Sequence, residues 1–363
     1  MKKIFLCISL LLIFCGCGKY NKEDVVKDFK NKVNKSDGYL LKGTLEIYRN
    51  EDLYTYDIES AYSKKDKFRV SLTNKTNNHE QLILKNEEGV YVITPSLNKS
   101  FKFQSKWPYN NSQIYLLQPI ISDLENDKSV KFTKNQDSYI LNFKANYIND
   151  KSLTKQKIYL DKNLNLKKVE VIDDNEDVIM RYTINKTDMN YKFSKTYFDL
   201  NTYYQDISDK NDSSNADKNS EEEKENSNQN NGQNSSDNKT ENKTNESDTS
   251  EASVTNDVLY PMYVPVDTYL KSQDVLATDD GNRTILTFTG QNSFTFVQSP
   301  ITSTVSGYIE GDPYLIYDTV GAITDNSVSW ISENKEYYLT SDTTNVDELL
   351  LVAQSLSVTE VGK

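Results

Sequence analysis

The sequence predicts an α+β protein with two folded parts joined by a disordered linker. Three observations predict this class. Tyr is abundant, with 25 residues against 13 Phe, and aromatic and polar residues alternate in many segments, which is typical of half-buried strands. Residues 209–253 contain no Val, Ile, Leu, Met or aromatic residue, so this segment has nothing to bury. Helical spacing is confined to a few short segments.

The first residues predict an export signal. Two lysines precede an apolar run from Ile4 to Phe14, which fits a signal-peptide core and is shorter than the roughly 20 residues of a membrane-spanning helix. The run Phe14-Cys15-Gly16-Cys17 then resembles the lipobox of bacterial lipoproteins. This resemblance implies that residues 1–16 are removed and that the thiol of Cys17 carries a lipid. An ordinary secretory signal with incidental cysteines is the alternative.

The sequence offers few residues that could carry out catalysis. With Cys17 acylated, the mature chain has no free thiol, which excludes a disulfide, a thiolate nucleophile and a Cys-ligated metal. His79 is the single histidine, and between polar residues it is expected to be a solvated loop residue rather than a general base. Gly311-Asp312-Pro313 predicts a turn between two strands and not a calcium loop. We therefore expect no enzyme, no cofactor and no metal site.

Residues 17–208 are predicted to form the first domain, which opens with a helix. In "NKEDVVKDFKNKV", Val25, Phe29 and Val33 recur at helical spacing, and Asn21 is placed to cap the helix with Asp24 three positions later.

Strands are predicted after this helix, because apolar residues recur at every second position after Gly38. The segments with strand patterns are "LYTYDIESAY", "KFRVSLT", "QLILKNEEGVYVIT" and "SFKFQSKW", and later "SVKFTK", "SYILNFKA", "QKIYLDK", "LKKVEVID" and "VIMRYTI". Between the two groups, Ile114, Leu117, Ile121 and Leu124 predict a second helical piece with a break near Pro119. Nine to eleven antiparallel strands with two helical pieces predict one curved sheet or an incomplete barrel.

An aromatic stripe marks this sheet as a candidate site. Its members are Tyr54, Tyr56, Tyr62, Phe101, Phe103 and Trp107. These side chains either line a lipid-binding concavity or form the core of the sheet, and the two roles overlap in an open barrel.

A disordered acidic linker over 209–256 and a second domain over 257–363 complete the chain. In the second domain, "RTILTFTG", "SFTFVQSP" and "VSWISENKEYYLTSD" predict strands. Asn345 is placed to cap a final helix, with Leu349, Val352, Ala353 and Leu356 on its buried face. We expect a small α+β domain.

Charge differs between the two parts. Residues 1–208 hold 33 Lys and Arg against 27 Asp and Glu, whereas residues 255–363 hold 4 against 15. The basic part faces anionic lipid head groups, faces its own acidic partner domain, or is simply a solvated surface. Export and the acidic second half argue against nucleic acid as a partner. With the linker between them, the acidic domain is expected to range outward from a basic domain held at the membrane.

The first domain resembles a known group. The run "GVYVITPSLNKSFKFQSKWPYNNSQIYLLQPIISDL", behind a lipobox and a short helix, resembles the LolA/LolB/RseB group, which includes germination lipoproteins of the GerS type. The resemblance covers about residues 20–208 and implies an open half-barrel with helices plugging its concave face. The second domain resembles a small uncharacterised domain that follows such lipoproteins in Gram-positive bacteria, and this likeness implies no function.

These observations predict a non-enzymatic lipoprotein, anchored to the membrane on its extracytoplasmic side. Its half-barrel is expected to bind a protein partner, such as a cell-wall enzyme of spore germination and cortex peptidoglycan processing. A lipid- or lipoprotein-binding module with an acyl ligand is one alternative. An envelope-stress sensor that regulates a sigma factor is another. Stable anchoring by two acyl chains argues against a shuttling carrier.

Overall fold

A computed structural model describes most of the two folded parts. The described residues are 20–49, 52–97, 99–147, 152–201, 203, 258–301, 306–316, 319–332 and 334–358. The predicted signal peptide (1–16), Cys17 and the predicted linker (209–256) lie outside the described residues. No helix in these ranges is both long enough and apolar enough to span a bilayer.

The first part contains two α-helices and eleven strands among the described residues. In chain order they are α2 (Lys22–Lys35), β1 (Gly38–Arg49), β2 (Asp52–Ser63), β3 (Lys67–Asn74), β4 (Glu80–Asn86), β5 (Gly89–Thr94), the 3₁₀ turn η1 (Pro95–Leu97), β6 (Lys99–Gln104), α3 (Leu117–Asn126), β7 (Lys131–Lys134), β8 (Ser138–Lys144), β9 (Leu153–Asp161), β10 (Leu166–Asp173) and β11 (Val178–Asp188).

Helix α2 begins where its cap predicts. The Asn21 side chain accepts a hydrogen bond from the Asp24 N–H (2.9 Å), and the Asp24 carboxylate accepts one from the Asn21 N–H (3.2 Å). This reciprocal pair satisfies two donors that a helix start leaves open. Val25, Phe29 and Val33 are buried, as the spacing predicts.

Helix α3 differs from its prediction. The expected break near Pro119 is wrong, because α3 runs unbroken from Leu117 to Asn126 with Pro119 in its first turn. A proline there costs little, since the N–H it lacks has no partner inside the helix. Leu116 provides no side-chain cap. Tyr39 of β1 replaces it: its hydroxyl accepts from the Leu117 N–H (3.1 Å) and donates to Gln118 (2.7 Å).

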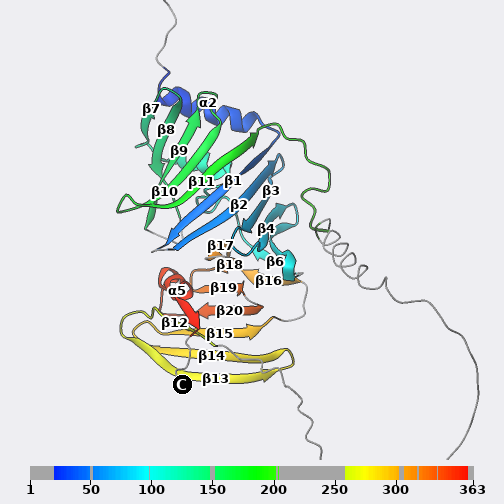
Figure 1. Ribbon diagram of the computed structural model, residues 1–363, viewed down its shortest axis with the longest axis vertical. Helices are drawn as coiled ribbons and strands as arrows, with labels where there is room; N and C mark the ends of the chain where they lie inside the picture. The colour runs from blue at the N-terminus through cyan, green and yellow to red at the C-terminus, as the bar shows by residue number, and fades with distance from the viewer. Residues whose placement is uncertain are drawn as a thin grey trace, which may run out of the picture.

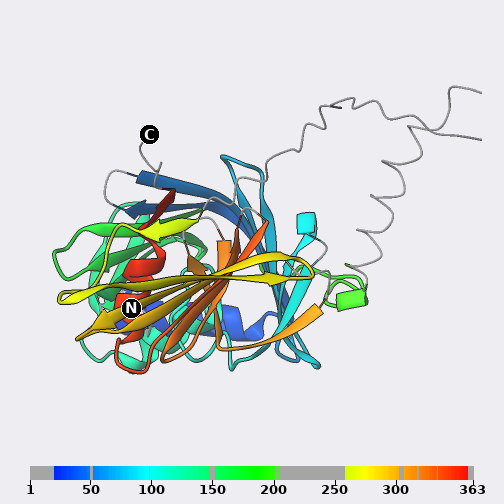
Figure 2. The ribbon, with the colours of Figure 1, turned by 90° about the horizontal axis from the view of Figure 1, so that it is seen from below.

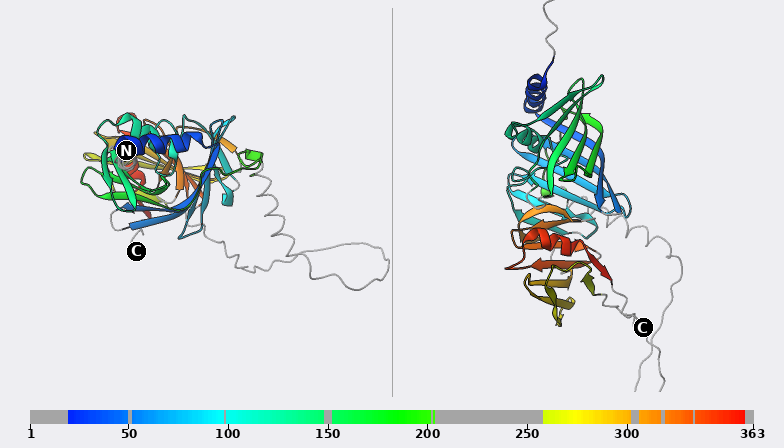
Figure 3. Two further views of the ribbon diagram at one scale, coloured as in Figure 1. Left: turned by 90° about the horizontal axis from the view of Figure 1, so that it is seen from above. Right: turned by 90° about the vertical axis from the view of Figure 1, so that its left-hand side faces the viewer.

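The strands of the first part form one open antiparallel sheet. Its order, β6-β5-β4-β3-β2-β1-β11-β10-β9-β8-β7, brings the first strand beside the last. Side chains of α2, α3 and one face of the sheet share a single apolar core, so both helices fill the concave face. On the opposite face, a smaller cluster forms where Phe198 and its aromatic neighbours cover β1, β2, β4 and β5. Figures 1 and 3 show α2 (blue) lying across one end of this sheet.

The second part is a smaller sheet with one helix. Its elements are β12 (Leu259–Pro261), β13 (Thr268–Thr278), β14 (Gly281–Gly290), β15 (Phe294–Pro300), β16 (Ser306–Glu310), β17 (Asp312–Ile316), β18 (Thr319–Ile323), β19 (Ser327–Ser332), β20 (Lys335–Thr340), α5 (Val346–Ala353) and β21 (Leu356–Val358).

Seven of these strands form a sheet in the order β13-β14-β15-β20-β19-β18-β17. Helix α5 packs on one face of it. Asn345 caps α5 by accepting from the Glu348 N–H (3.0 Å), as predicted. Leu356 was expected on the buried face of this helix; that is wrong, because α5 ends at Ala353 and Leu356 begins β21, which pairs with β12. Together with the open first sheet, this arrangement confirms the predicted α+β class.

The two parts are docked, which overturns the expectation that the acidic domain ranges outward. Strand β16 pairs in parallel with β6 and becomes the twelfth strand of the first sheet within the described residues. Val320 and Ala322 of β18 are buried in the core of the first part. Figure 1 shows β16, β17 and β18 where the two sheets meet. The second part therefore closes the open end of the half-barrel.

A single glycine lets the chain pass between the two sheets. Gly311 separates β16, in the first sheet, from β17, in the second. The predicted three-residue turn is wrong, because Asp312 and Pro313 belong to β17 and the two strands do not pair with each other. Gly311 has φ +114°, and a Cβ at this position would lie 2.3 Å from the Ile323 carbonyl oxygen. Only glycine fits this backbone without strain.

Candidate functional site

A large cavity lies between the two parts. Its volume is about 750 Å³, which falls within the roughly 300–1,000 Å³ of small-molecule pockets. Strands β4, β5 and β6 form one wall, and β15, β18, β19 and β20 form the other. The first wall contributes Gln81, Val92, Thr94, Lys99, Phe101 and Phe103. The second contributes Asp325, Asn326, Ser329, Trp330, Glu336 and Tyr338, among others. We call this space the interdomain cavity.

Gln81 fixes the two walls against each other. Its carbonyl oxygen accepts from the Val320 N–H, and its amide nitrogen donates to the Val320 carbonyl (3.4 Å) and to the Thr94 hydroxyl (3.2 Å). Gln81 is buried, and a buried amide retains stability only when its polar atoms are paired. One glutamine side chain thus extends the hydrogen-bond pattern of β18 into the first part.

Charges in the interdomain cavity are mainly acidic. Glu310, Asp325 and Glu336 line it, against one cation, Lys99. Lys99 is buried and lies 3.4 Å from the Glu336 carboxylate. A buried cation is costly unless paired, so this pair across the two parts also favours their docking. Asp325 on the second wall and Glu310 of β16, beside β6, remain, so the cavity favours a cationic or hydrogen-bonding occupant.

The predicted aromatic stripe does not converge on one site. Phe101 and Phe103 line the interdomain cavity. Tyr56 and Trp107 are buried in the concave core. Tyr62 packs between Tyr39 and Phe68, with ring centroids 5.4 and 5.1 Å away.

Tyr54, the remaining member, lines a separate space on the concave face. That space has a volume of only about 80 Å³ and is closed on one side by Tyr314 and Leu315 of β17. It is far smaller than the pockets that hold drug-sized ligands. The concavity is therefore filled by the helices of the first part and by the edge of the second sheet.

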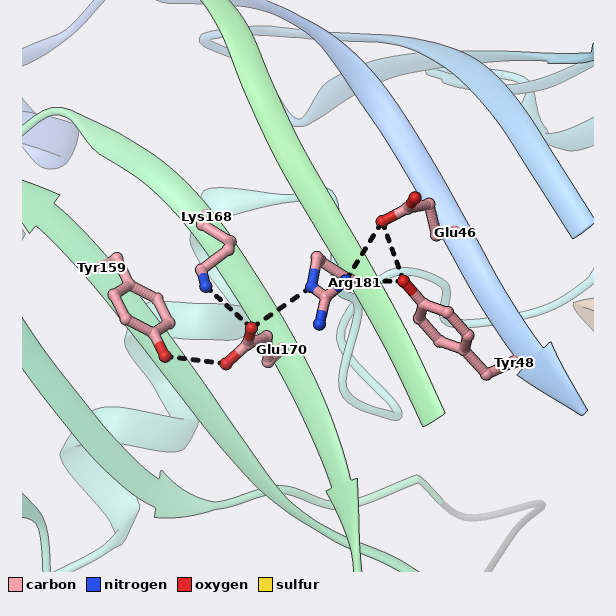
Figure 4. A network of polar contacts seen from close by, with 6 residues as sticks. All are labelled: Glu46, Tyr48, Tyr159, Lys168, Glu170 and Arg181. Atoms are coloured by element: carbon pink, nitrogen blue, oxygen red, sulfur yellow. Dashed lines mark hydrogen bonds and ion pairs between the residues drawn. The ribbon is translucent and has the colours of Figure 1, made fainter. Parts of the chain in front are cut away.

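A polar network lies on the opposite, outer face of the first sheet (Figure 4). Its centre is Glu170, which is 5% exposed. Glu170 accepts from Lys168 (2.8 Å), Tyr159 (2.8 Å) and Arg181 (3.3 Å). Burial alone would raise the pKa of Glu170, but these donors hold it below its usual range.

Arg181 extends the network to β1. It donates to the Tyr48 hydroxyl (2.6 Å) and lies 3.5 Å from the Glu46 carboxylate. The network therefore crosses the neighbouring strands β9, β10, β11 and β1 through residues that lie opposite each other on paired strands. Because its carboxylates and cations satisfy one another, we interpret it as a device that stiffens the sheet.

A polar hollow of about 540 Å³ lies at the end of α3. Asp123, within it, accepts from the Ser112 hydroxyl (2.7 Å), yet burial raises the pKa of its carboxyl to about 6. The pKa of nearby Asp127 is shifted in the opposite direction. Although partial burial acts to raise its pKa, hydrogen bonds from the Ser129 hydroxyl and N–H and from the Lys144 N–H hold it below the usual value.

The sequence did not indicate the interdomain cavity. Lys99, Asp325 and Glu336 are single charged residues in ordinary strand or turn segments, far apart in the chain. Within the described residues, no group of three or more His, Cys, Asp and Glu side chains is arranged to hold a metal ion. His79 lies in the turn before β4, with its Nδ1 3.4 Å from the Ser96 hydroxyl. This contact is at the surface, as expected of a loop histidine.

Comparison with known proteins identifies a relative that matches nearly the whole chain. No family model matches the chain. The chain is 30% identical over 350 residues to the sporulation protein YdcC of Bacillus subtilis, a match that covers 95% of this chain and 93% of that protein.

Three solved structures belong to the group that the sequence resembles. The Pseudomonas aeruginosa MucA/MucB complex matches 92% of this chain and 98% of its own at 11% identity, with a TM-score of 0.32. The GerS lipoprotein complex with the CwlD amidase of Clostridioides difficile matches 48% and 95% at 18% identity (TM-score 0.26). A LolA superfamily protein of Nitrosomonas europaea matches 49% and 98% at 13% identity (TM-score 0.28).

Proposed function

Since the chain belongs to the family of the Bacillus subtilis sporulation protein YdcC, we propose that it is a non-enzymatic protein of sporulating cells that binds a protein partner outside the cytoplasm. We place it on the outer face of the membrane, with a lipid on Cys17 and residues 1–16 removed. The lipobox-like run Phe14-Cys15-Gly16-Cys17 supports this location.

The observation that carries the partner role is the docking of the two parts. An acyl carrier needs an apolar concavity that a chain can enter, whereas the space that Tyr54 lines on the concave face measures only about 80 Å³. The interdomain cavity does have the size of a ligand pocket, and it is open to solvent, lined by both parts and partly polar. Such a wall suits a polar segment of another protein better than a lipid tail.

Charge indicates what kind of segment fits. Asp325 and Glu310 add negative charge to a cavity that is also lined by Trp330 and the half-exposed ring of Tyr338. A lysine or arginine side chain gains from both features, through ion pairing and cation–π contact. By the resemblance of the first part to germination lipoproteins, we propose an enzyme of cortex peptidoglycan processing as the partner.

The partner claim is tested by quantitative capture. The tagged full chain would be expressed in sporulating cells, cross-linked and recovered from detergent extract. An envelope protein or cell-wall enzyme recovered with the unaltered chain should be lost with Tyr338→Ala. It should be retained with Leu53→Ala, because Leu53 is similarly exposed but lies on β2 away from the cavity. Recovery of no such protein in repeated experiments would reject the partner role.

Anchoring has its own test. Labelled palmitate should enter the full chain in cells and should be absent from Cys17→Ala, while Cys15→Ala keeps the label. Equal labelling of the unaltered chain, Cys17→Ala and Cys15→Ala would show that the lipid is not on Cys17.

A further inference from the structure

The second sheet ends in a long edge strand. Strand β13 is eleven residues long, contains no proline and pairs with β14 on one side alone within the described residues. Figures 1 and 2 show β13 and β14 (yellow) at the end of the molecule remote from the first sheet. Long exposed edges attract other strands, and proteins usually shorten or cover them.

The other sheet ends carry such protection. Strand β7 is four residues long, with a lysine at each end. Strand β17 contains Pro313 and lies close to β6. Strand β16 is five residues long. Strand β13 carries one lysine, Lys271, at a register shift, but it is the longest of these four edge strands and has no proline, so it offers the most backbone for pairing.

Apolar side chains on β13 support this reading. Tyr269 is 65% exposed, Leu270 41%, Val275 53% and Leu276 51%. Nearby Met262 and Val266 are also exposed. Single exposed apolar residues need no explanation, but four of them along one edge strand are typical of an interaction surface.

The register with β14 assigns these side chains to two faces. Leu270 and Gln273 lie opposite the buried Phe288 and Leu286, so they share the core-side face, as does Val275. Tyr269, Ser272, Asp274 and Leu276 share the opposite face. Lys271 has no partner on β14, because the register shifts by one residue at this point.

We propose that β13 pairs antiparallel with β13 of a second copy of this chain, about a two-fold axis at Gln273, so that two seven-stranded sheets become one. In this register each Gln273 lies opposite its counterpart. Leu270 lies opposite Val275 of the second copy on one face, and Tyr269 lies opposite Leu276 of the second copy on the other. All four exposed apolar side chains of the strand thus gain apolar neighbours on the correct face.

Charge complementarity specifies the same register. With the register shift retained, Lys271 and Ser272 together lie opposite Asp274 of the second copy. Two symmetric Lys–Asp pairs result, and no like charges are directly opposed between Asp267 and Thr278. A strand that complements itself in both apolar and charged positions is better explained by a second copy than by a foreign strand.

A cysteine at the axis gives the first test. The chain from Gly18 onward retains every described residue and contains no cysteine. In this chain, Gln273→Cys should form a covalent dimer under mild oxidation, because directly opposed residues are about 4.5–5.5 Å apart at Cα, within disulfide range. Leu53→Cys, at an exposed position remote from β13, should remain uncross-linked. A covalent dimer formed equally well by both variants would overturn the proposal.

Charge reversal gives the second test. By sedimentation equilibrium, the unaltered chain should dimerise. Lys271→Asp or Asp274→Lys alone should weaken the dimer at least tenfold, and the double variant should restore it, because the pairing is re-formed with reversed signs. Rescue cannot come from non-specific apolar association. A chain that stays monomeric at 100 μM overturns the proposal, including the case in which β13 instead accepts a strand from another protein. Single variants that dimerise normally overturn it as well.

Discussion

Tyr39 shows how a single side chain can tie a helix to a sheet. Its ring is fully buried in the concave core, and its hydroxyl performs the capping role that Leu116 cannot perform for α3. This role is invisible in the sequence, since the cap lies 78 residues before the helix it serves. Local patterns reveal local caps such as Asn21, and they miss caps that come from another element.

Tyr39→Phe is therefore expected to lower the free energy of unfolding by about 1–3 kcal/mol, because it leaves the buried Leu117 N–H and Gln118 without their partner. Urea unfolding measures the loss. Tyr139→Phe is the matched control: Tyr139 is also buried in this core, but it caps no helix. Equal effects of the two changes would show that the capping bonds of the Tyr39 hydroxyl contribute nothing beyond what any buried tyrosine hydroxyl in this core contributes.

Asp123 is expected to make stability fall with rising pH. Its folded pKa is raised from 3.8 to about 6, so between about pH 4 and pH 6 the folded state keeps a proton that the unfolded state has lost. Stability therefore decreases as pH rises through this window. Asp123→Asn should raise the urea midpoint at pH 7.5 and change it little at pH 4.

Asp127→Asn should behave oppositely in the same assay. Hydrogen bonds to the charged form lower the Asp127 pKa, so its carboxylate stabilises the fold at neutral pH, and this contribution is lost as pH falls through the folded pKa. The variant should lower the midpoint at pH 7.5. If both variants shift stability in the same direction at pH 7.5, the assignment of opposite charge effects is wrong.

At the scale of elements, agreement between sequence and structure follows the range of each interaction. The start of α2 and the hairpin from β4 to β5 rest on neighbouring residues, and both are where the sequence predicts them. The position of β16 rests on a partner about 200 residues away in the chain. Nothing in its five residues distinguishes a strand that pairs with β17 from one that pairs with β6. For the same reason the interdomain cavity could not be predicted.

Gly311→Ala is expected to weaken the attachment of β16. The positive φ of Gly311 and the close Ile323 carbonyl oxygen imply a cost of about 1–3 kcal/mol, carried by the segment that crosses between the sheets. Amide hydrogen exchange in β6 should become faster, because β16 protects that edge. Gly281→Ala is the control, with φ +123° in the β13–β14 turn. It should leave exchange in β6 unchanged, and faster exchange in both variants would indicate general destabilisation.

At the scale of the molecule, docking makes one body of two parts with opposite charge. The buried contacts that hold the two parts together are mostly uncharged. They are the β16–β6 ladder, the Val320 and Ala322 side chains in the first core, and the Gln81 bridge. The Lys99–Glu336 pair adds an ionic contact, and Asp312 accepts from Ser105 and Asn110 of the first part. Long-range attraction between basic and acidic halves favours encounter, while the apolar and backbone contacts determine how firmly the parts stay together.

Cutting the chain between the two parts should therefore not separate them. With a specific protease site inserted after Asn230, in the predicted linker, both fragments should co-elute in gel filtration at micromolar concentration. They should do so also in 0.5 M NaCl, because salt screens mainly the exposed charges. Gln81→Ala should make the cut fragments separate more readily, since the covalent link no longer keeps their effective concentration high. Uncut Gln81→Ala should still elute as one species. If the cut fragments of the unaltered chain elute apart in low salt, the contacts between β6, β16 and β18 do not hold the two parts together on their own, and the interdomain cavity depends on the intact chain.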